Sequence, residues 1–370
     1  MHISSTFHSG NIVVDDIRDD VATLRIRPDH GSDHLQWFHF RVHGARGRRI
    51  TYRITNAAKA SYPEAWTDYR TRMSHDRVTW RGVDTEYKDG ALTFTATAEH
   101  DVVWFAYFAP YSDERHQDRL ALAQQHPDVR VDMLTETLDG APLDRIVVGN
   151  PEGPAVWVIA RQHPGETMAE WCVEGFVDRL LDRADPVGRW LLANAQLHIV
   201  PNCNPDGSRR GHLRTNAAGA NLNREWAEPT AERSPEVLAI RNAMDESGVA
   251  ICLDVHGDEA IPYTFVAGSP AIPSWTDTQA NQLDVFRKAM VHASPDFQTR
   301  HGYPVAAPGK ANLTMATNQV AERFGAFSVT LEMPFKDHDD LPDAEVHFSP
   351  ERARRMGAAL LDGVRAVLRA

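Results

Sequence analysis

An antiparallel β-sandwich, followed by an α/β domain with a mixed sheet flanked by helices, is the fold that the 370-residue sequence predicts. Before about residue 112, short segments of alternating apolar and polar residues are separated by turns rich in Gly and Asp, which is typical of a sandwich. After about residue 129, apolar segments of strand length alternate with amphipathic segments of helical length. That rhythm is typical of an α/β sheet covered on both faces.

The first part, residues 1–112, is expected to consist of short strands. Its alternating segments are Asn11–Ile17, Val21–Arg27, Gln36–Val42, Arg49–Thr55, Leu92–Ala98 and Val102–Phe108. Aromatic residues concentrate in these segments, and such residues more often build a core than a binding face. Its polar residues form no cluster at the ends of the strands. We therefore expect this part to be structural or to orient substrate, with no catalytic residue.

A single helix is predicted to link the two parts, within residues 113–128. Ser112 is a candidate N-cap, the helical pattern runs to about Gln125, and His126-Pro127 ends it.

In the third part, residues 129–370, predicted strands alternate with predicted helices. Its predicted strands are Val129–Glu136, Arg145–Gly149, Ala155–Ala160, Ala195–Pro201, Val249–Val255 and Ser328–Met333. Its predicted helices are Thr167–Asp182, Ser234–Asp245, Thr276–His292, Gln319–Phe324 and Pro350–Leu368. Open α/β sheets build their sites at the carboxyl ends of strands, so polar residues that follow these strands are the candidates for chemistry.

The composition argues against two classes of binding partner. A net charge of −12 argues against nucleic acid or an anionic membrane as the main partner, because both need a basic surface. No apolar run approaches the roughly 20 residues of a membrane helix, and the start of the chain lacks the pattern of a signal peptide. The three cysteines, Cys172, Cys203 and Cys252, lie in apolar segments and are expected to be buried free thiols. These features predict a cytoplasmic protein.

Two strand ends carry metal-binding side chains. His163 and Glu166 follow one apolar strand, and His256 follows another, Ile251–Val255. Imidazole nitrogens and a carboxylate oxygen are ligands of zinc, and three protein ligands leave a fourth position open. The sequence therefore predicts a catalytic zinc site rather than a structural one.

Further polar residues follow strands at the same predicted edge. Asn202–Gly207 follows one strand, Asp254 and Asp258 flank His256, and Glu332 lies near the end of another strand. Asp254 is a candidate for orienting a ligand histidine through a hydrogen bond, although a strand-end cap is the simpler interpretation.

The segment Arg209–Trp226 has neither helical nor strand periodicity and is rich in Arg, Asn and Gly. Guanidinium and amide donors suit a carboxylate or an oxyanion, so this segment is interpreted as a loop that binds anions. A solvated basic loop is the alternative.

Together these motifs resemble the zinc metallocarboxypeptidases, and more closely their cytosolic carboxypeptidase-like subfamily. The motifs are His163-Pro164-Gly165-Glu166, Asn204-Pro205-Asp206-Gly207, Gly211–Arg214, Asn221–Trp226, Asp254–Gly257 and Thr330–Glu332. In the first part, Trp37–Val42 and Phe105–Tyr111 resemble the β-sandwich domain of that subfamily. The resemblance covers nearly the whole chain, and the motifs occur in the order of the family.

The resemblance implies a role for each matching residue. One zinc ion per chain would be bound by His163, Glu166 and His256. Glu332 would be the general base, and Arg214 would polarise the scissile carbonyl group. Asn223 and Arg224 would bind the terminal carboxylate of the substrate. The implied activity is removal of the C-terminal residue from peptides or proteins, whose C-termini would be the partners.

Two other functions are considered, a zinc-dependent deacylase of N-acyl amino acids and a catalytically idle binding protein. Glu332 and Arg214 argue against the second, because a binding protein needs neither a base nor an oxyanion donor. The preferred side chain stays open, including glutamate: Thr314-Met315-Ala316 stands where deglutamylases of the family tend to have an Arg, and Lys310 is a possible substitute. The oligomeric state is also left open.

Overall fold

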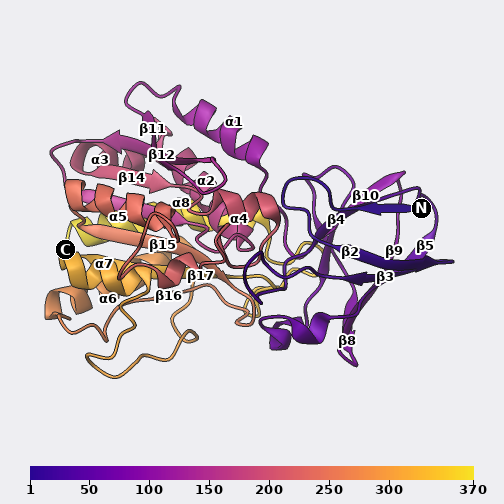
Figure 1. Cartoon of the computed structure of the whole chain (residues 1–370). Helices are drawn as coiled ribbons and strands as arrows, with labels where there is room; N and C mark the ends of the chain where they lie inside the picture. Colours follow the sequence, from indigo (N-terminus) through magenta and orange to yellow (C-terminus); the bar gives the residue numbers. More distant parts are fainter.

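The computed structural model describes all 370 residues, and its first part is a sandwich of two five-stranded sheets (Figure 1). One sheet has the order β1 (His2–Ser4), β4 (His39–His43), β10 (Val102–Ala106), β6 (Thr71–Ser74) and β7 (Arg81–Val83). The other has the order β2 (Val13–Arg18), β3 (Val21–Arg25), β5 (Arg49–Ile54), β9 (Ala91–Thr97) and β8 (Thr85–Lys88). The predicted sandwich is therefore confirmed.

Two details of the sandwich differ from the expectation. The pair β3 and β5 is parallel, because after β3 the chain crosses to β4 in the other sheet before it returns as β5. The short strands β1, β6, β7 and β8 are absent from the predicted set, since three or four residues give too little alternation to recognise. Two 3-10 turns, η1 (Ala57–Lys59) and η2 (Pro63–Trp66), lie in this part as well.

The second part contains the predicted mixed sheet, which has seven strands. Their order is β11 (Arg130–Glu136), β12 (Pro142–Gly149), β14 (Gln196–Val200), β13 (Ala155–Ala160), β15 (Ile251–Asp258), β17 (Phe327–Pro334) and β16 (Phe265–Ala267). The central strands β14, β13, β15 and β17 run parallel, and the outer pairings are antiparallel. The carboxyl ends of the central strands consequently meet at one edge.

Helices cover both faces of this sheet (Figure 1). They are α1 (Asp113–Ala123), α2 (Thr167–Leu180), α3 (Pro186–Asn194), α4 (Pro205–Arg210), α5 (Pro235–Ser247), α6 (Asp277–Ala293), α7 (Ala316–Phe324) and α8 (Pro350–Leu368). Val156 and Val158 of β13 pack in the core with α2, α6 and α8, whereas Trp157 and Ile159 pack in a smaller core with α5 and α7. This split follows from the alternation of side chains along a strand. None of the helices combines the length and apolar character that crossing a membrane requires.

The predicted helices form within a few residues of their expected limits, and two more are present. The helix α3 is capped by Asp185, whose carboxylate accepts hydrogen bonds from the amides of Val187 and Gly188, and Pro186 occupies its first turn. That Asp-Pro signal is visible in the sequence. The six-residue helix α4 is too short for a period to emerge.

The sandwich and the α/β part share one apolar core, a cluster of 71 buried residues that includes side chains from both. At their contact the rings of Tyr107 and Phe335 are stacked, with centroids 4.6 Å apart. Arg72 donates a hydrogen bond to the carbonyl oxygen of Phe335 at 3.0 Å. The limits of the parts at residues 112 and 128 stay a prediction. The three cysteines are buried free thiols, as expected.

The linking helix α1 begins at Ser112, whose hydroxyl accepts a hydrogen bond from the amide of Arg115. His116 of this helix contacts two carboxylates of the α/β part. Its Nδ1 lies 2.6 Å from Glu170 Oε1, and its Nε2 lies 3.3 Å from Asp144 Oδ2. Burial opposes the charged ring, but the hydrogen bonds and charges of Asp144 and Glu170 raise the pKa of His116 from 6.5 to about 9.

A pH dependence of stability follows for the docking of α1. A pKa raised in the folded state means that the stabilisation by His116 is fully present below pH 6.5 and is lost as the pH rises through about 9. Between pH 6 and pH 10 the free energy of unfolding should fall by about 3 kcal/mol more in the wild type than in His116→Gln. Denaturant unfolding at both pH values measures this difference, and equal falls in the two proteins would contradict it.

Candidate active site

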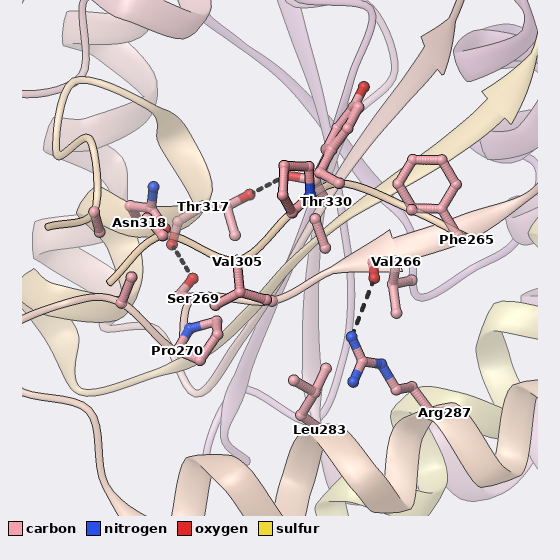
Figure 2. A pocket seen from close by; sticks show the side chains of 18 of the residues that line it. Phe265, Val266, Ser269, Pro270, Leu283, Arg287, Val305, Thr317, Asn318 and Thr330 are labelled. Carbon is pink, nitrogen blue, oxygen red and sulfur yellow. Dashed lines mark hydrogen bonds between the residues drawn. The ribbon is translucent and has the colours of Figure 1, made fainter. Parts of the chain in front are cut away.

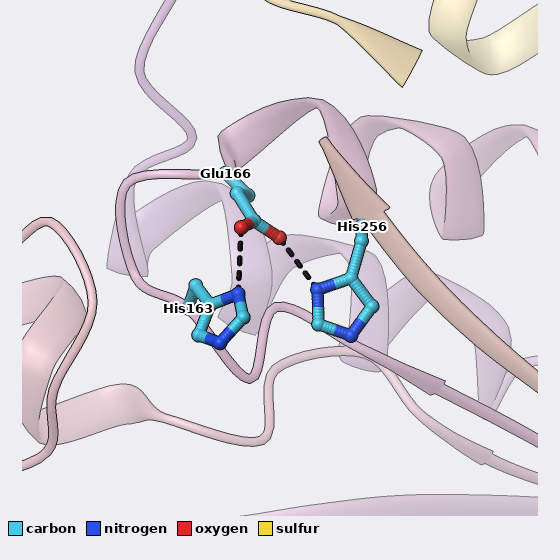
Figure 3. Close-up of side chains that lie close together, drawn as sticks. All are labelled: His163, Glu166 and His256. Carbon is cyan, nitrogen blue, oxygen red and sulfur yellow. Dashed lines mark hydrogen bonds and ion pairs between the residues drawn. The ribbon is translucent and has the colours of Figure 1, made fainter. Parts of the chain in front are cut away.

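The three predicted metal ligands lie together at the carboxyl edge of the sheet (Figure 3). His163 and Glu166 lie in the turn between β13 and α2, and His256 is in β15. Because β13 and β15 are parallel neighbours, their carboxyl ends bring these side chains to one place. All three are buried, and one donor atom from each lies within 4.8 Å of the others.

Both imidazole rings turn Nδ1 toward Glu166. Nδ1 of His163 lies 2.6 Å from Glu166 Oε1, and Nδ1 of His256 lies 2.7 Å from Glu166 Oε2. On the far side of each ring, Nε2 of His163 meets Asn221 Oδ1 and Nε2 of His256 meets Asp254 Oδ1, both at 3.0 Å. Nε2 of each ring donates a hydrogen bond to that oxygen, so in the neutral ring Nδ1 carries the lone pair and faces the shared site.

The charges at this point suit a divalent cation. Burial and the charge of Arg214 lower the pKa of His163 to about 4, so its ring is neutral near pH 7, as a metal ligand must be. Burial opposes a charge on Glu166, yet the two imidazoles beside it lower its pKa below the ordinary value. At His256 burial is again opposed, here by Asp254 and Glu166, which raise its pKa. These carboxylates favour positive charge at this point, which a bound cation would supply in place of the proton on the ring. Two nitrogen donors and one carboxylate in a buried pocket fit zinc.

Glu332 lies beside this site on β17, in register with His256 on β15. Its side chain is 6% exposed. Oε1 accepts a hydrogen bond from the hydroxyl of Tyr303 at 3.1 Å, whereas the buried Oε2 has no partner in the protein. Burial is the main cause that raises the pKa of Glu332, and the charges of Glu166 and Asp258 add to it. Among the buried side-chain atoms without a partner it is the only carboxylate oxygen, which makes it a candidate for a chemical role.

Arg214 lies in the loop that follows α4. Its guanidinium lies over the ring of Tyr62, 5.6 Å from the centroid, and donates no hydrogen bond to a protein group. The carboxylates of Glu259 and Glu166 are among the charges near it. Its donors therefore remain free for a ligand.

Asn223 and Arg224 lie in the 3-10 turn η3 (Leu222–Arg224), but they differ in burial and in hydrogen-bond partners. Asn223 is buried, its Oδ1 accepts a hydrogen bond from the amide of Ala316, and its Nδ2 lies 3.5 Å from His256 Nε2. Arg224 is exposed and donates to the carbonyl oxygen of Asn223 at 2.6 Å. Burial and then the charge of Arg214 lower the pKa of Arg224, so the two guanidiniums lie near enough to repel each other. Such a pair favours an anion between them.

Tyr303 is a candidate site residue that the sequence did not predict. Its hydroxyl lies 2.6 Å from Asp258 Oδ2 and 3.1 Å from Glu332 Oε1. It belongs to an exposed loop without periodicity, residues 299–310. A lone Tyr between Gly302 and Pro304 gives no signal in the sequence, because its proximity to Glu332 arises only in the folded chain.

A cavity of about 710 Å³ (Figure 2) has Tyr303, which donates a hydrogen bond to Glu332, among its lining residues. Thr330, two residues before Glu332 on β17, lines it, and the hydroxyls of Thr330 and Thr317 lie 2.6 Å apart. Arg287 of α6 reaches the carbonyl oxygen of Val266 from the opposite wall at 3.5 Å. Lys310, the basic residue considered for side-chain recognition, is also part of the lining. The cavity has both apolar walls and cationic groups.

Family models match both parts of the chain. Residues 3–108 match the cytosolic carboxypeptidase N-terminal domain, and residues 118–352 match zinc carboxypeptidase. An uncharacterized protein of Zymomonas mobilis is 50% identical, with 96% of this chain and 94% of that protein aligned. Human cytosolic carboxypeptidase 1 is 28% identical over 80% of this chain, but the alignment covers only 29% of that longer protein.

Solved structures of similar proteins align over almost the whole chain. A metallo-carboxypeptidase from Burkholderia cenocepacia has 46% identity and a TM-score of 0.97, with 100% of this chain and 99% of that chain covered. A metallo-carboxypeptidase from Pseudomonas aeruginosa, in complex with (2-guanidinoethylmercapto)succinic acid, has 42% identity and a TM-score of 0.95, with 98% of each chain covered.

Proposed function

The chain belongs to the zinc carboxypeptidase family, and from this premise we propose that it removes the C-terminal residue of peptides or proteins with Glu332 as general base. The observation that carries the proposal is the buried Oε2 of Glu332, which has no partner and lies beside the site of His163, Glu166 and His256. Peptide or protein C-termini are the proposed partners, and a cytoplasmic location stays a prediction.

Each residue has a distinct task in this proposal. His163, Glu166 and His256 would hold one zinc ion, which would polarise a carbonyl oxygen and lower the pKa of bound water. Glu332 accepts a proton from the attacking water at Oε2 and then passes it to the leaving amine. Arg214 donates hydrogen bonds to the carbonyl oxygen as negative charge develops there.

Recognition of the chain end is assigned to the turn η3. Arg224 offers a planar pair of donors that suits a carboxylate, and Asn223 adds an amide donor beside it. The matches to carboxypeptidase models over both parts of the chain do not favour the deacylase or the idle binding protein.

The proposal is tested with one peptide prepared as the free acid and as the C-terminal amide. The kcat/KM for the amide should be lower by about 10²-fold or more, because hydrogen bonds to charged groups are worth roughly 1.5–3 kcal/mol and the guanidinium would be left poorly paired. Arg224→Ala should show a similar loss on the acid and little further loss on the amide. Product analysis by mass spectrometry gives the rates.

The matched control is Arg355→Ala, which removes an exposed arginine of α8 that pairs only with Glu351. This variant should discriminate between acid and amide as the wild type does. Equal cleavage of both peptides by the wild type would mean that the chain end is not recognised, and the carboxypeptidase proposal would be wrong.

A further inference from the structure

We propose that Asp29, a residue of the N-terminal sandwich part, is a positioning residue for Arg214; this inference rests on the role proposed above for Arg214. Asp29 lies in the turn after β3 and is 3% exposed. Its Oδ1 accepts a hydrogen bond from the amide of Leu213 at 2.6 Å. Its Oδ2 accepts from the amides of Arg214 and Thr215 at 2.8 and 2.9 Å, and from the hydroxyl of Thr215 at 3.1 Å.

Three consecutive backbone N–H groups therefore converge on one buried carboxylate. Hydrogen bonds to an ionised acceptor are roughly twice as strong as those between neutral groups. The segment that donates them forms neither helix nor strand, so no ladder of its own fixes these amides. Asp29 supplies the acceptors that regular structure would otherwise supply.

Neighbouring residues of the sandwich part hold the same loop. The amide of His30 donates to Nε2 of His212 at 3.0 Å. The side chain of Asn11 donates from Nδ2 to the carbonyl oxygen of Gly211 at 2.8 Å. The loop is thus bound to the sandwich at several successive residues. Asp29 is the residue that binds the backbone amide of Arg214 itself.

The side chain of Arg214 is also in contact with the sandwich part. Its guanidinium lies over the ring of Tyr62, and no protein acceptor fixes its nitrogens. The backbone of Tyr62 is held in turn by Gln36, which accepts from its amide at 3.0 Å and donates to its carbonyl oxygen at 3.1 Å. Arg214 is therefore positioned at its backbone and at its charged end by residues that precede the linking helix.

The same segment reaches the metal-binding turn on its other side. The carbonyl oxygen of Leu213 accepts a hydrogen bond from the amide of Gly165 at 2.9 Å, between His163 and Glu166. The peptide unit between Leu213 and Arg214 thus joins Asp29 to the turn that bears the zinc ligands. Asp29 sets the distance between Arg214 and this turn, and a displacement of about 1 Å can lower a rate by 10²-fold.

The variant Asp29→Asn tests this role, because it keeps the size of the side chain but replaces one acceptor with a donor that faces backbone N–H groups. We expect kcat on the free-acid peptide to fall by about 10- to 100-fold, with KM changed by less than about threefold and zinc content unchanged. In the Arg214→Ala background the same change should have no further effect on kcat, since Asp29 acts through Arg214.

The matched control is Asp76→Asn. Asp76 also accepts two backbone amide bonds, from Val78 and Thr79, but these residues lie within the sandwich part. This variant should keep wild-type kcat. Should Asp29→Asn fail to fold, Thr215→Val removes only the hydroxyl bond and should lower kcat, by about threefold, with KM unchanged.

Three results would overturn the inference while leaving the proposed function intact. The first is a wild-type kcat in Asp29→Asn. The second is a loss of kcat on Asp29→Asn that is as large in the Arg214→Ala background as in the wild type. The third, where Thr215→Val has to be used, is an unchanged kcat in that variant. If the wild type itself cleaves no peptide, the proposed function fails. Hydrogen exchange then still tests whether Asp29 holds the loop of residues 213–215. The amides of residues 213–215 should exchange at least about tenfold faster in Asp29→Asn than in Asp76→Asn; equal exchange would contradict the contact.

Discussion

Glu332→Gln is expected to lower kcat by about 10²–10⁴-fold while zinc content and Tm stay at the wild-type values. Glutamine has the shape of glutamate and can still accept the hydrogen bond from Tyr303, but its side chain does not take up a proton at neutral pH. The loss should lie in kcat rather than in KM, because proton transfer contributes only in the transition state. Steady-state rates on a free-acid peptide, together with metal analysis, measure it.

A companion variant separates proton transfer from the orientation of Tyr303. Asp258→Asn keeps the Glu332 side chain and changes the other acceptor of the Tyr303 hydroxyl, at 2.6 Å. It also removes a charge near Glu332, while the Asn oxygen can still accept from the amides of Ala260 and Ile261. We expect it to lower kcat by less than about tenfold. A Glu332→Gln enzyme that kept more than a tenth of the wild-type kcat would show that another group is the base.

His163→Ala is expected to reduce the zinc content from one ion per chain to nearly none. Two protein ligands would remain, Glu166 and His256, and a site with two ligands does not hold zinc against dialysis. Loss of a residue that only orients a ligand lowers metal affinity by about 10- to 100-fold, so the loss of a ligand should exceed about 100-fold. Turnover should disappear with the metal.

Metal analysis after dialysis against a weak chelator measures this effect. His198→Ala is a suitable control, because His198 is also a buried histidine of the α/β part but stacks on Trp157 in β13, away from the metal ligands. That variant should keep one zinc. A His163→Ala protein with full zinc content would mean that the ligand set is wrong.

The elements that the sequence predicts well are those in which one local pattern decides the structure. The apolar run of β13 is buried along its whole length, and its end places His163 and Glu166 where a short-range spacing could indicate them. The same holds for His256 and β15. These residues are recognisable because strand, turn and ligand are adjacent in the chain.

The functions of Tyr303 and Asp29 could not be predicted in this way, because both depend on contacts between distant parts of the chain. Asp29 and Leu213 are 184 residues apart in sequence, and Tyr303 and Glu332 are 29 apart. A single Asp in a polar turn indicates only a turn. The short strands β6, β7 and β8 and the parallel pair of β3 and β5 are likewise decided by packing between sheets rather than by local preference.

The shared core of the two parts limits how this enzyme can be rebuilt. A chain shortened to the α/β part would keep all the proposed site residues, yet it would expose Phe335, which now stacks on Tyr107, and would leave the amides around Arg214 without Asp29. The α/β part contains the proposed site residues, but both parts would have to be transferred to move the activity into another protein. A chimaera that exchanges the sandwich for that of a relative has to carry the turn after β3 along with the loop it holds.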